Sequence, residues 1–158
     1  MKDKQKAFAT FTKTERCSFA FIGAFIFQFS QLEFSIRHKL AALLELSEDQ
    51  FDVVTSRYDF VALCGVTKKL LDARHKEDKK YLSKIKKVFS ECKTLNDEAR
   101  LPVVHGLWTD GRKGGLACRY VSRTSLDAQF LLEDEENKIQ GWIEAAKILM
   151  IKILELKV

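Results

Sequence analysis

The sequence predicts a mainly α-helical fold: a four-to-five-helix up-and-down bundle with a small β-hairpin or extended insertion before the last helix. Apolar residues recur at steps of three and four along most of the chain, as on one face of an amphipathic helix. The chain holds one proline and seven glycines, too few for the many turns of a sheet-rich domain. Because the 158 residues contain no repeat and no linker, residues 1–158 are expected to form a single domain.

Composition narrows the class of protein. Apolar residues make up 46% of the chain and charged residues 31%, which is typical of a soluble globular protein and not of a disordered one. A net charge of +5 favours polyanionic partners such as RNA, DNA or acidic membranes without choosing among them. The cysteines form no C-x-x-C pair, so we expect no metal site, no cofactor, and reduced, mostly buried thiols in a cytoplasmic protein. They are Cys17, Cys64, Cys92 and Cys118.

The N-terminal residues have the outline of a signal peptide, with a basic "MKDKQK" before an apolar "CSFAFIGAFIF". No small-residue cleavage site follows, and the apolar residues continue with helical periodicity past Gln28. The unbroken apolar run is also shorter than the ~20 residues that span a bilayer. We therefore expect no membrane partner.

Residues 14–45 are predicted to form one long helix, with Thr14 able to cap its start. Phe21, Phe27 and Phe34 lie off its main apolar stripe, which suggests a second surface that packs against another helix or a second protomer. The stripe itself comprises Phe19, Ile22, Phe25, Ile26, Phe29, Leu32, Ile36, Leu40 and Leu43.

The remaining elements follow from caps and periodicity. Helices are predicted over 48–55, 57–75, 77–93, 94–105 and from Asp134 onward, with Ser47 and Thr94 opening two of them. Leu116 to Val121 suits a half-buried strand, and residues 128–133 a second short one. The lysines of 77–93 fit either a solvated face or a surface that meets phosphate groups. These are Lys79, Lys80, Lys84, Lys86 and Lys87.

The stretch "EARLPVVHGLW" combines a helix end with chemically useful side chains. Gly106 is placed as a helix-ending glycine, and a histidine such as His105 in the last turn is favoured by the helix dipole. Arg100 can pair with Asp97 three residues earlier. Pro102 is unusual within a helix, because it removes a backbone hydrogen bond and clashes with the preceding turn. A kink or bulge there, or pairing across a dimer, are two ways in which Arg100 and His105 could converge.

The spacing Arg100-x4-His105 and the run "LNDEARLPVVHGLW" resemble the R-x4-6-H motif of the HEPN family (higher eukaryotes and prokaryotes nucleotide-binding domains). The resemblance implies a helical bundle that is often a dimer, with the two motifs meeting at the interface. It also implies a metal-independent endoribonuclease, in a toxin–antitoxin, abortive-infection, phage-defence or CRISPR-related setting, with a possible antitoxin or regulatory protein as partner. The residue after the motif arginine is usually polar in that family, and here it is Leu101.

The chemistry of these residue types suits RNA cleavage without metal. A histidine can take and give the proton when the 2′-OH attacks the adjacent phosphorus, and a guanidinium can stabilise the charge on two phosphoryl oxygens. Asn96 and Glu98 are candidates for the missing polar role. Candidate contacts to the RNA backbone are Lys84, Lys87, Arg112 and Lys113.

Two alternatives to an enzyme remain open. The chain could be a catalytically inactive HEPN-like module that binds RNA, a nucleotide or a partner protein. It could also be an unrelated helical interaction protein in which the motif arises by chance.

Overall fold

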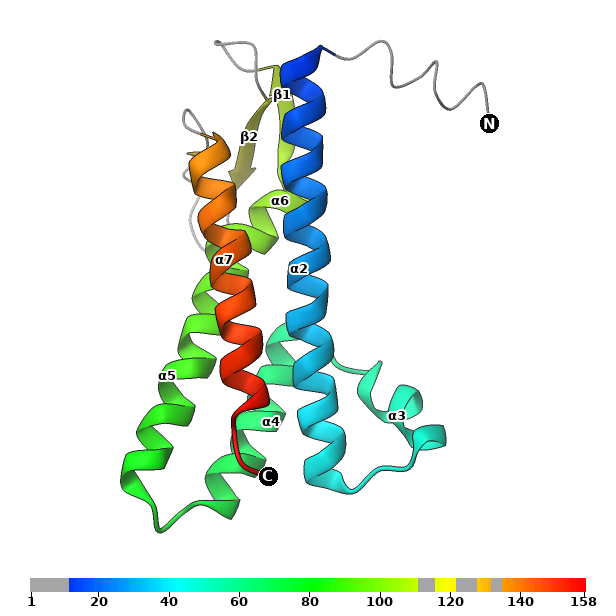
Figure 1. Ribbon diagram of the computed structural model, residues 1–158, viewed down its shortest axis with the longest axis vertical. Helices are drawn as coiled ribbons and strands as arrows, with labels where there is room; N and C mark the ends of the chain where they lie inside the picture. Colours follow the sequence, from blue (N-terminus) through cyan, green and yellow to red (C-terminus); the bar gives the residue numbers. More distant parts are fainter. Residues whose placement is uncertain (1–11, 111–115, 122–127, 132–134) are drawn as a thin grey trace.

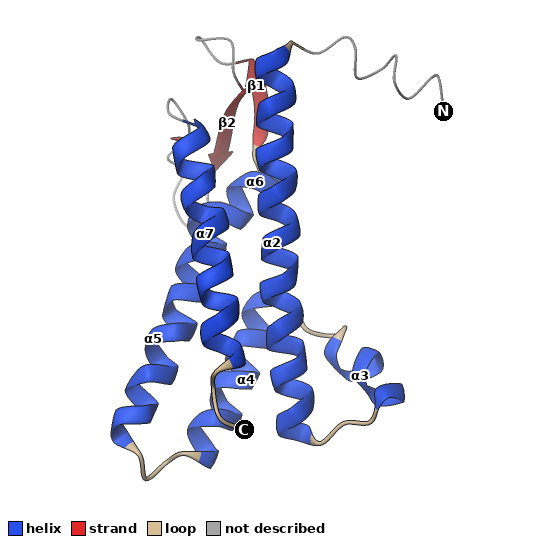
Figure 2. Cartoon of the chain, viewed as in Figure 1, coloured by secondary structure: helices blue, strands red, loops and turns tan. Residues whose placement is uncertain are grey.

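The computed structural model describes residues 12–110, 116–121, 128–131 and 135–158 (Figure 1). It confirms the mainly α bundle with a small β insertion before the last helix (Figure 2). The elements in chain order are α2 (Lys13–Leu44), α3 (Glu48–Thr55), α4 (Phe60–Arg74), α5 (Lys79–Leu95), the π-helical turn η1 (Asn96–Arg100), α6 (Leu101–His105), β1 (Leu107–Asp110), β2 (Leu116–Val121), β3 (Ala128–Leu131) and α7 (Glu135–Leu154).

Side-chain caps fix where the long helices begin. Thr12, not Thr14, is the N-cap of α2: its hydroxyl accepts from the Glu15 N–H at 3.2 Å, and the Glu15 carboxylate accepts from the Thr12 N–H. This reciprocal pair satisfies two backbone donors that the first turn of a helix leaves unpaired. Asp59 and Asp78 cap α4 and α5 with a single bond each, their carboxylates accepting from the Ala62 and Tyr81 N–H groups at 2.7 and 2.9 Å. Each start therefore follows from a short polar side chain in the sequence.

The four long helices form a bundle in which α2 and α5 lie diagonally opposite, each packed against α4 and α7. Phe29 packs on Phe60 and Arg74 reaches the Leu43 carbonyl, so α4 runs parallel to α2. Helix α7 also runs parallel to α2, and α5 alone runs the opposite way (Figure 1). The chain therefore does not strictly alternate in direction; α3 and its connections return it before α4 begins.

Helix α2 contributes most of its predicted apolar stripe to the core, beside residues from α4, α5 and α7, whereas Phe19 at the start of that stripe is 37% exposed. Phe25, Leu32, Ile36 and Leu40 are completely buried. Phe25 contacts Phe29 and Trp142, at ring-centroid distances of 5.9 and 5.8 Å. Burial of each such side chain contributes about 1.5–3 kcal/mol. Helices α4 and α7 both pack against α2, because the two together bury this apolar stripe.

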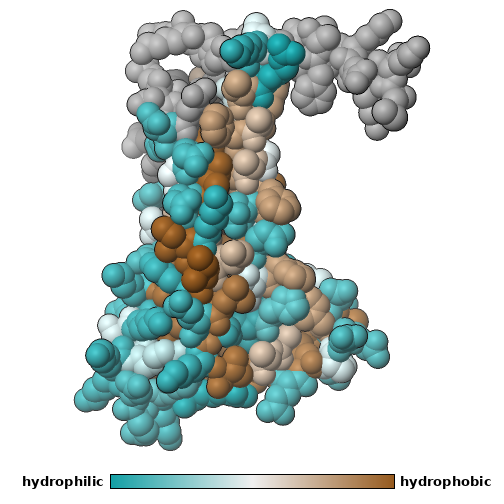
Figure 3. All heavy atoms as spheres, in the orientation of Figure 1, coloured by the Kyte–Doolittle hydropathy of each residue, from teal (hydrophilic) through white to brown (hydrophobic). Residues whose placement is uncertain are grey.

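A second set of apolar side chains stays exposed. Phe27 is 64% exposed and Phe34 48%, which agrees with their predicted position off the main stripe, whereas Phe21 is half-buried. On α7 the exposed apolar residues are Ile148, Ile151 and Leu154. Figure 3 shows hydrophobic atoms gathered along both helices on one face of the molecule. This face is available to another surface.

Helix α2 also meets the length and hydropathy criterion for a membrane span over Glu15–Leu44, with a mean hydropathy of 1.4 in its most apolar window. Of that window, 28% is buried inside the protein. Core helices of soluble proteins and N-terminal signal sequences meet the same criterion, so this is weak grounds for a membrane location.

A three-stranded antiparallel sheet in the order β1-β2-β3 forms the insertion. Strand β2 has the predicted bounds, and its Cys118 is buried while Arg119 is exposed, as alternation requires. Strand β3 lies inside the predicted 128–133. Strand β1 was not predicted, because its four residues carry no alternation and depend on β2 for their backbone partners. Asp134, the predicted start of α7, lies outside the described residues.

All four cysteines are thiols, as expected, and three of them are buried. A hydrogen bond with Cys92, together with burial, raises the pKa of the Cys64 thiol well above its usual range. Because the thiolate is the reactive form, Cys64 is chemically unreactive, and the two buried cysteines pack between α4 and α5.

Replacing Phe25 by alanine should lower the free energy of unfolding by about 3–5 kcal/mol, because it leaves a cavity between α2 and α7. Phe27→Ala, on the exposed face of the same helix, is the matched control and should change it by less than about 1 kcal/mol. Urea unfolding followed by circular dichroism measures both. Equal losses for the two variants would contradict the assignment of the core face.

Candidate functional site

The stretch with Arg100 and His105 lies on a continuation of α5. The helix passes through the π-turn η1, where the Leu101 N–H donates to the Asn96 carbonyl five residues earlier, and then becomes α6. Thr94 therefore does not begin a new helix as predicted, since it lies inside α5. Its spacing to Asp97 matches a capping pattern, but a helix that continues has no unpaired N–H groups to cap.

The π-turn explains how Pro102 is tolerated. Proline has no N–H to donate, and its ring clashes with the carbonyl of the preceding turn of an α-helix. Here Pro102 occupies the first turn of α6, directly after the wider η1 turn, where it is buried. Its carbonyl accepts from the Gly106 N–H at 2.8 Å and from the Cys118 thiol at 3.3 Å. Such π-turns are rare and frequently occur at functional sites.

Position 106, directly after the helix end, requires glycine for a steric reason. Its backbone is extended, with φ −72° and ψ 152°, and not left-handed as a helix-ending glycine was expected to be. A Cβ at this position would lie 2.2 Å from the Cys118 sulfur and 2.4 Å from the Pro102 carbonyl oxygen. Only glycine lets β2 approach α6 this closely. The Trp108 indole then donates to the Val103 carbonyl at 3.1 Å and fixes β1 on the helix end.

Arg100 and His105 do not converge within one chain. Arg100 is the last residue of the π-turn, its backbone is right-handed α-helical with φ −64° and ψ −47°, and α6 continues from Leu101 to His105. At about 100° per residue, the two side chains leave the helix about 140° apart. Arg100 is half-buried and His105 is exposed, and within the described part of the chain neither makes a hydrogen bond or ion pair. Of the two predicted routes to convergence, pairing between two copies is the one compatible with this geometry.

The two supporting candidates have different surroundings. Asn96 is 1% exposed; its amide donates to the Asp97 carboxylate at 2.9 Å, and its buried Oδ1 has no partner among the described residues. It faces the interior, so it can position the π-turn and does not reach the surface. Glu98 is exposed. Asp97 accepts from Asn96, and no ion pair with the predicted partner Arg100 is present in the described segments.

The predicted RNA-contacting lysines lie on α5, upstream of the motif. Lys84 and Lys87 are exposed, with the Lys84 ammonium 4.0 Å from the Glu155 carboxylate. Lys79, Lys80 and Lys86 are exposed on the same helix. Arg112 and Lys113 lie outside the described residues. Among the described side chains, no three His, Cys, Asp or Glu residues gather so that they could hold a metal ion.

The sequence did not point to a cavity that opens between α2 and α3. It has a volume of about 530 Å³ and is lined by Phe34, His38, Ala41, Ala42, Leu46, Ser47, Glu48, Phe51 and Asp52. The available signal was Phe34, an aromatic off the main stripe, followed closely by the acidic run from Glu45 to Asp52. Periodicity could not place these residues together, because the turn between α2 and α3 sets their distance.

Asn96→Leu should leave the free energy of unfolding unchanged or raise it by about 1 kcal/mol, because leucine has a similar volume and removes an unpaired buried acceptor. Asn96→Ala, which leaves a cavity, is the comparison and should lower it. Chemical denaturation measures both. A loss of more than about 2 kcal/mol in the leucine variant would mean that Oδ1 has a stabilising partner.

Comparisons with known proteins assign no family to this chain. No protein-family model, no curated protein and no solved structure matches it. The resemblance of Arg100 to Trp108 to the HEPN motif therefore stays a hypothesis from sequence. The function has to be argued from the side chains themselves and from where the fold places them.

Proposed function

We propose that this protein is a HEPN-like, metal-independent endoribonuclease whose active site is completed by two copies of the chain. The observation that carries the proposal is how Arg100 and His105 are placed on their helix. They are an arginine and a histidine on one helix, directed about 140° apart, and neither has a hydrogen bond or ion pair among the described residues. In a symmetric dimer, Arg100 of one copy can face His105 of the other, which gives two equivalent sites.

The reaction proceeds by transfer within the RNA itself. The proton of a 2′-OH passes to an imidazole, the 2′ oxygen bonds to phosphorus, and the bond from phosphorus to the 5′ oxygen breaks. The departing 5′ oxygen takes up a proton, leaving a 2′,3′-cyclic phosphate and a 5′-OH. His105 accepts the proton of the 2′-OH and returns a proton to the 5′ oxygen. Arg100 stabilises the charge that develops on the phosphoryl oxygens.

The surroundings of the motif supply the other requirements. Val104 and Leu107 flank His105 and Gly106 and are 47% and 64% exposed, so apolar surface beside the motif is available for contact between copies. The lysines of α5 lead toward the same helix end and suit contacts with the RNA backbone, Lys84 and Lys87 among them. A cytoplasmic location without a membrane partner belongs to the same proposal.

A second function is favoured by one observation. Leu101, half-buried directly after Arg100, supplies no polar group to orient the pair. If the dimer does not bring Arg100 and His105 to one phosphate, the Arg100 guanidinium and the exposed lysines of α5 can still bind RNA, a nucleotide or an acidic partner. The chain would then be an inactive HEPN-like binding module.

His105→Ala and Arg100→Ala should each lower the rate of RNA cleavage by about 10²–10⁴-fold, because each removes a group that acts in the transition state. The assay uses labelled RNA containing single-stranded and structured regions, in EDTA, with end-group analysis for cyclic phosphate. His75→Ala is the control, since His75 contacts the Lys157 carbonyl far from the motif. RNA binding without cleavage by the wild type selects the binding module, and no interaction with RNA rejects both functions.

Mixing the two inactive variants tests the shared site. In a random mixture half of the dimers are mixed, and each keeps one intact pair, so about one quarter of the wild-type activity should return. Arg100→Ala mixed with itself is the baseline. If activity stays at that baseline while the subunits demonstrably exchange, the site does not combine Arg100 of one copy with His105 of the other.

A further inference from the structure

The cavity between α2 and α3 is a built feature of the fold. Helix α3 stands away from the bundle beside the C-terminal end of α2 (Figure 1). The gap keeps its volume of about 530 Å³ because Ala41 and Ala42 present only methyl groups to it. Its walls are largely exposed, including Phe34, Glu48 and Asp52. The site is thus an open groove with a volume typical of ligand sites.

Aromatic rings hold the groove open on one side. The His38 ring packs edge-on against Phe34 at 4.4 Å and lies 4.7 Å from Phe51, between centroids. Phe34 and Phe51 are themselves 5.9 Å apart. These contacts link α2 to α3 through three rings, and they leave ring faces and edges beside the cavity. Such surfaces attract both apolar groups and cations.

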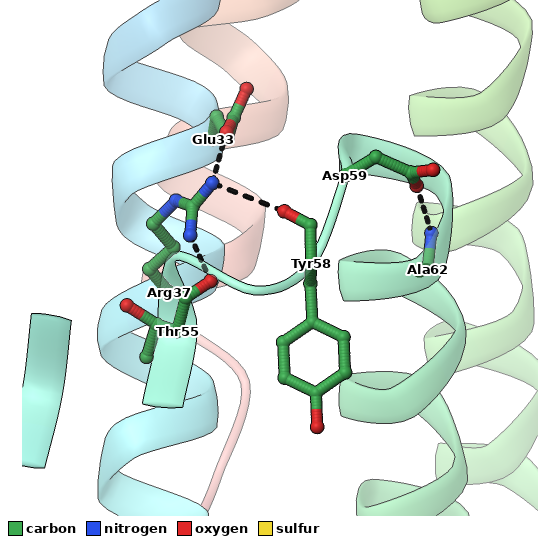
Figure 4. Close-up of polar contacts among 6 residues, drawn as sticks. All are labelled: Glu33, Arg37, Thr55, Tyr58, Asp59 and Ala62. Carbon is green, nitrogen blue, oxygen red and sulfur yellow. Dashed lines mark hydrogen bonds and ion pairs between the residues drawn. The ribbon is translucent and has the colours of Figure 1, made fainter. Parts of the chain in front are cut away.

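Arg37 fixes the other end of α3. Its guanidinium donates to the Thr55 carbonyl, to the Tyr58 carbonyl at 3.3 Å and to the Glu33 carboxylate at 2.6 Å (Figure 4). Asp59, which follows directly, caps α4 through the Ala62 N–H. The C-terminal end of α3 is therefore tied to α2 and α4. The hydrogen bonds of Arg37 thus hold α3 in position beside the groove, and its guanidinium is engaged with Glu33, Thr55 and Tyr58.

The groove is acidic within a basic protein. Glu45, Glu48, Asp49 and Asp52 lie within eight residues that contain no lysine or arginine. No ion pair involves any of them in the described part of the structure, and Glu48 and Asp52, one helical turn apart, line the cavity. These features favour a cationic occupant and disfavour RNA.

We propose that this groove binds a basic segment of a partner protein, one that carries a lysine or arginine next to an apolar side chain. The apolar side chain fills the space over Ala41 and Ala42, and the cation lies between the Glu48 and Asp52 carboxylates and the rings. A peptide suits the open groove better than a small molecule, because its chain continues into solvent on both sides. The site does not depend on RNA cleavage, since it uses neither Arg100 nor His105.

The probe is a displayed library of random twelve-residue peptides, selected on the full-length protein. Enriched peptides should contain a lysine or arginine within two positions of an aliphatic or aromatic residue. A labelled synthetic copy should bind about tenfold more weakly to the double variant Glu48→Gln, Asp52→Asn, and equally weakly to Ala42→Trp, which fills the groove. Asp49→Asn is the matched control, since Asp49 lies on α3 but does not line the cavity.

Other results overturn the proposal. They are enrichment of acidic or uncharged peptides, no enrichment, binding that both groove variants leave unchanged, or displacement of the peptide by an RNA oligonucleotide. Unfolding curves and RNA binding of each variant are measured in parallel. Both should match the wild type, so that a failure of this site is distinguished from misfolding and from a failure of the nuclease proposal.

Discussion

Along its 32 residues, α2 buries one apolar stripe against α4 and α7, and every other feature of the molecule is placed by that contact. Phe25, Leu32, Ile36 and Leu40 have no solvent exposure, because α4 and α7 together cover this stripe. Helix α5 closes the bundle on the side opposite α2. The helix that carries Arg100 and His105 contributes core residues from Ile85 to Val103, and its last part, α6, contacts β2.

The same arrangement separates three kinds of surface. The outer faces of α2 and α7 are apolar, α5 carries the lysines, and α3 with its preceding turn is acidic. Surfaces of different chemistry bind different partners, so the proposed RNA contacts along α5 do not compete with the proposed peptide groove at α3. A bundle with four long helices can support both, because each helix exposes the face that the core does not use.

Much of the fold could be predicted from the sequence, and the candidate site only in part. The bounds of α3 were predicted to the residue, since Ser47 and the acidic first turn mark its start. For Arg100 and His105, sequence predicted a helix and a proline that disturbs it, but not the π-turn at Asn96. That turn forms where Asn96 and Ala99 are buried together, which a local pattern does not specify. The function of the pair is still a proposal.

By itself, the sequence determined most of the helical segments, the start of α3 at Ser47 and most of the buried stripe of α2, because each depends on residues within a few positions of one another. Only the tertiary structure decided the rest. The directions of α4 and α7, the close approach of Cys118 that makes Gly106 necessary, and the groove beside α3 all depend on contacts between distant segments. Arg100 and His105 are separated around one helix axis, so the pairing proposed for them requires a second copy of the chain.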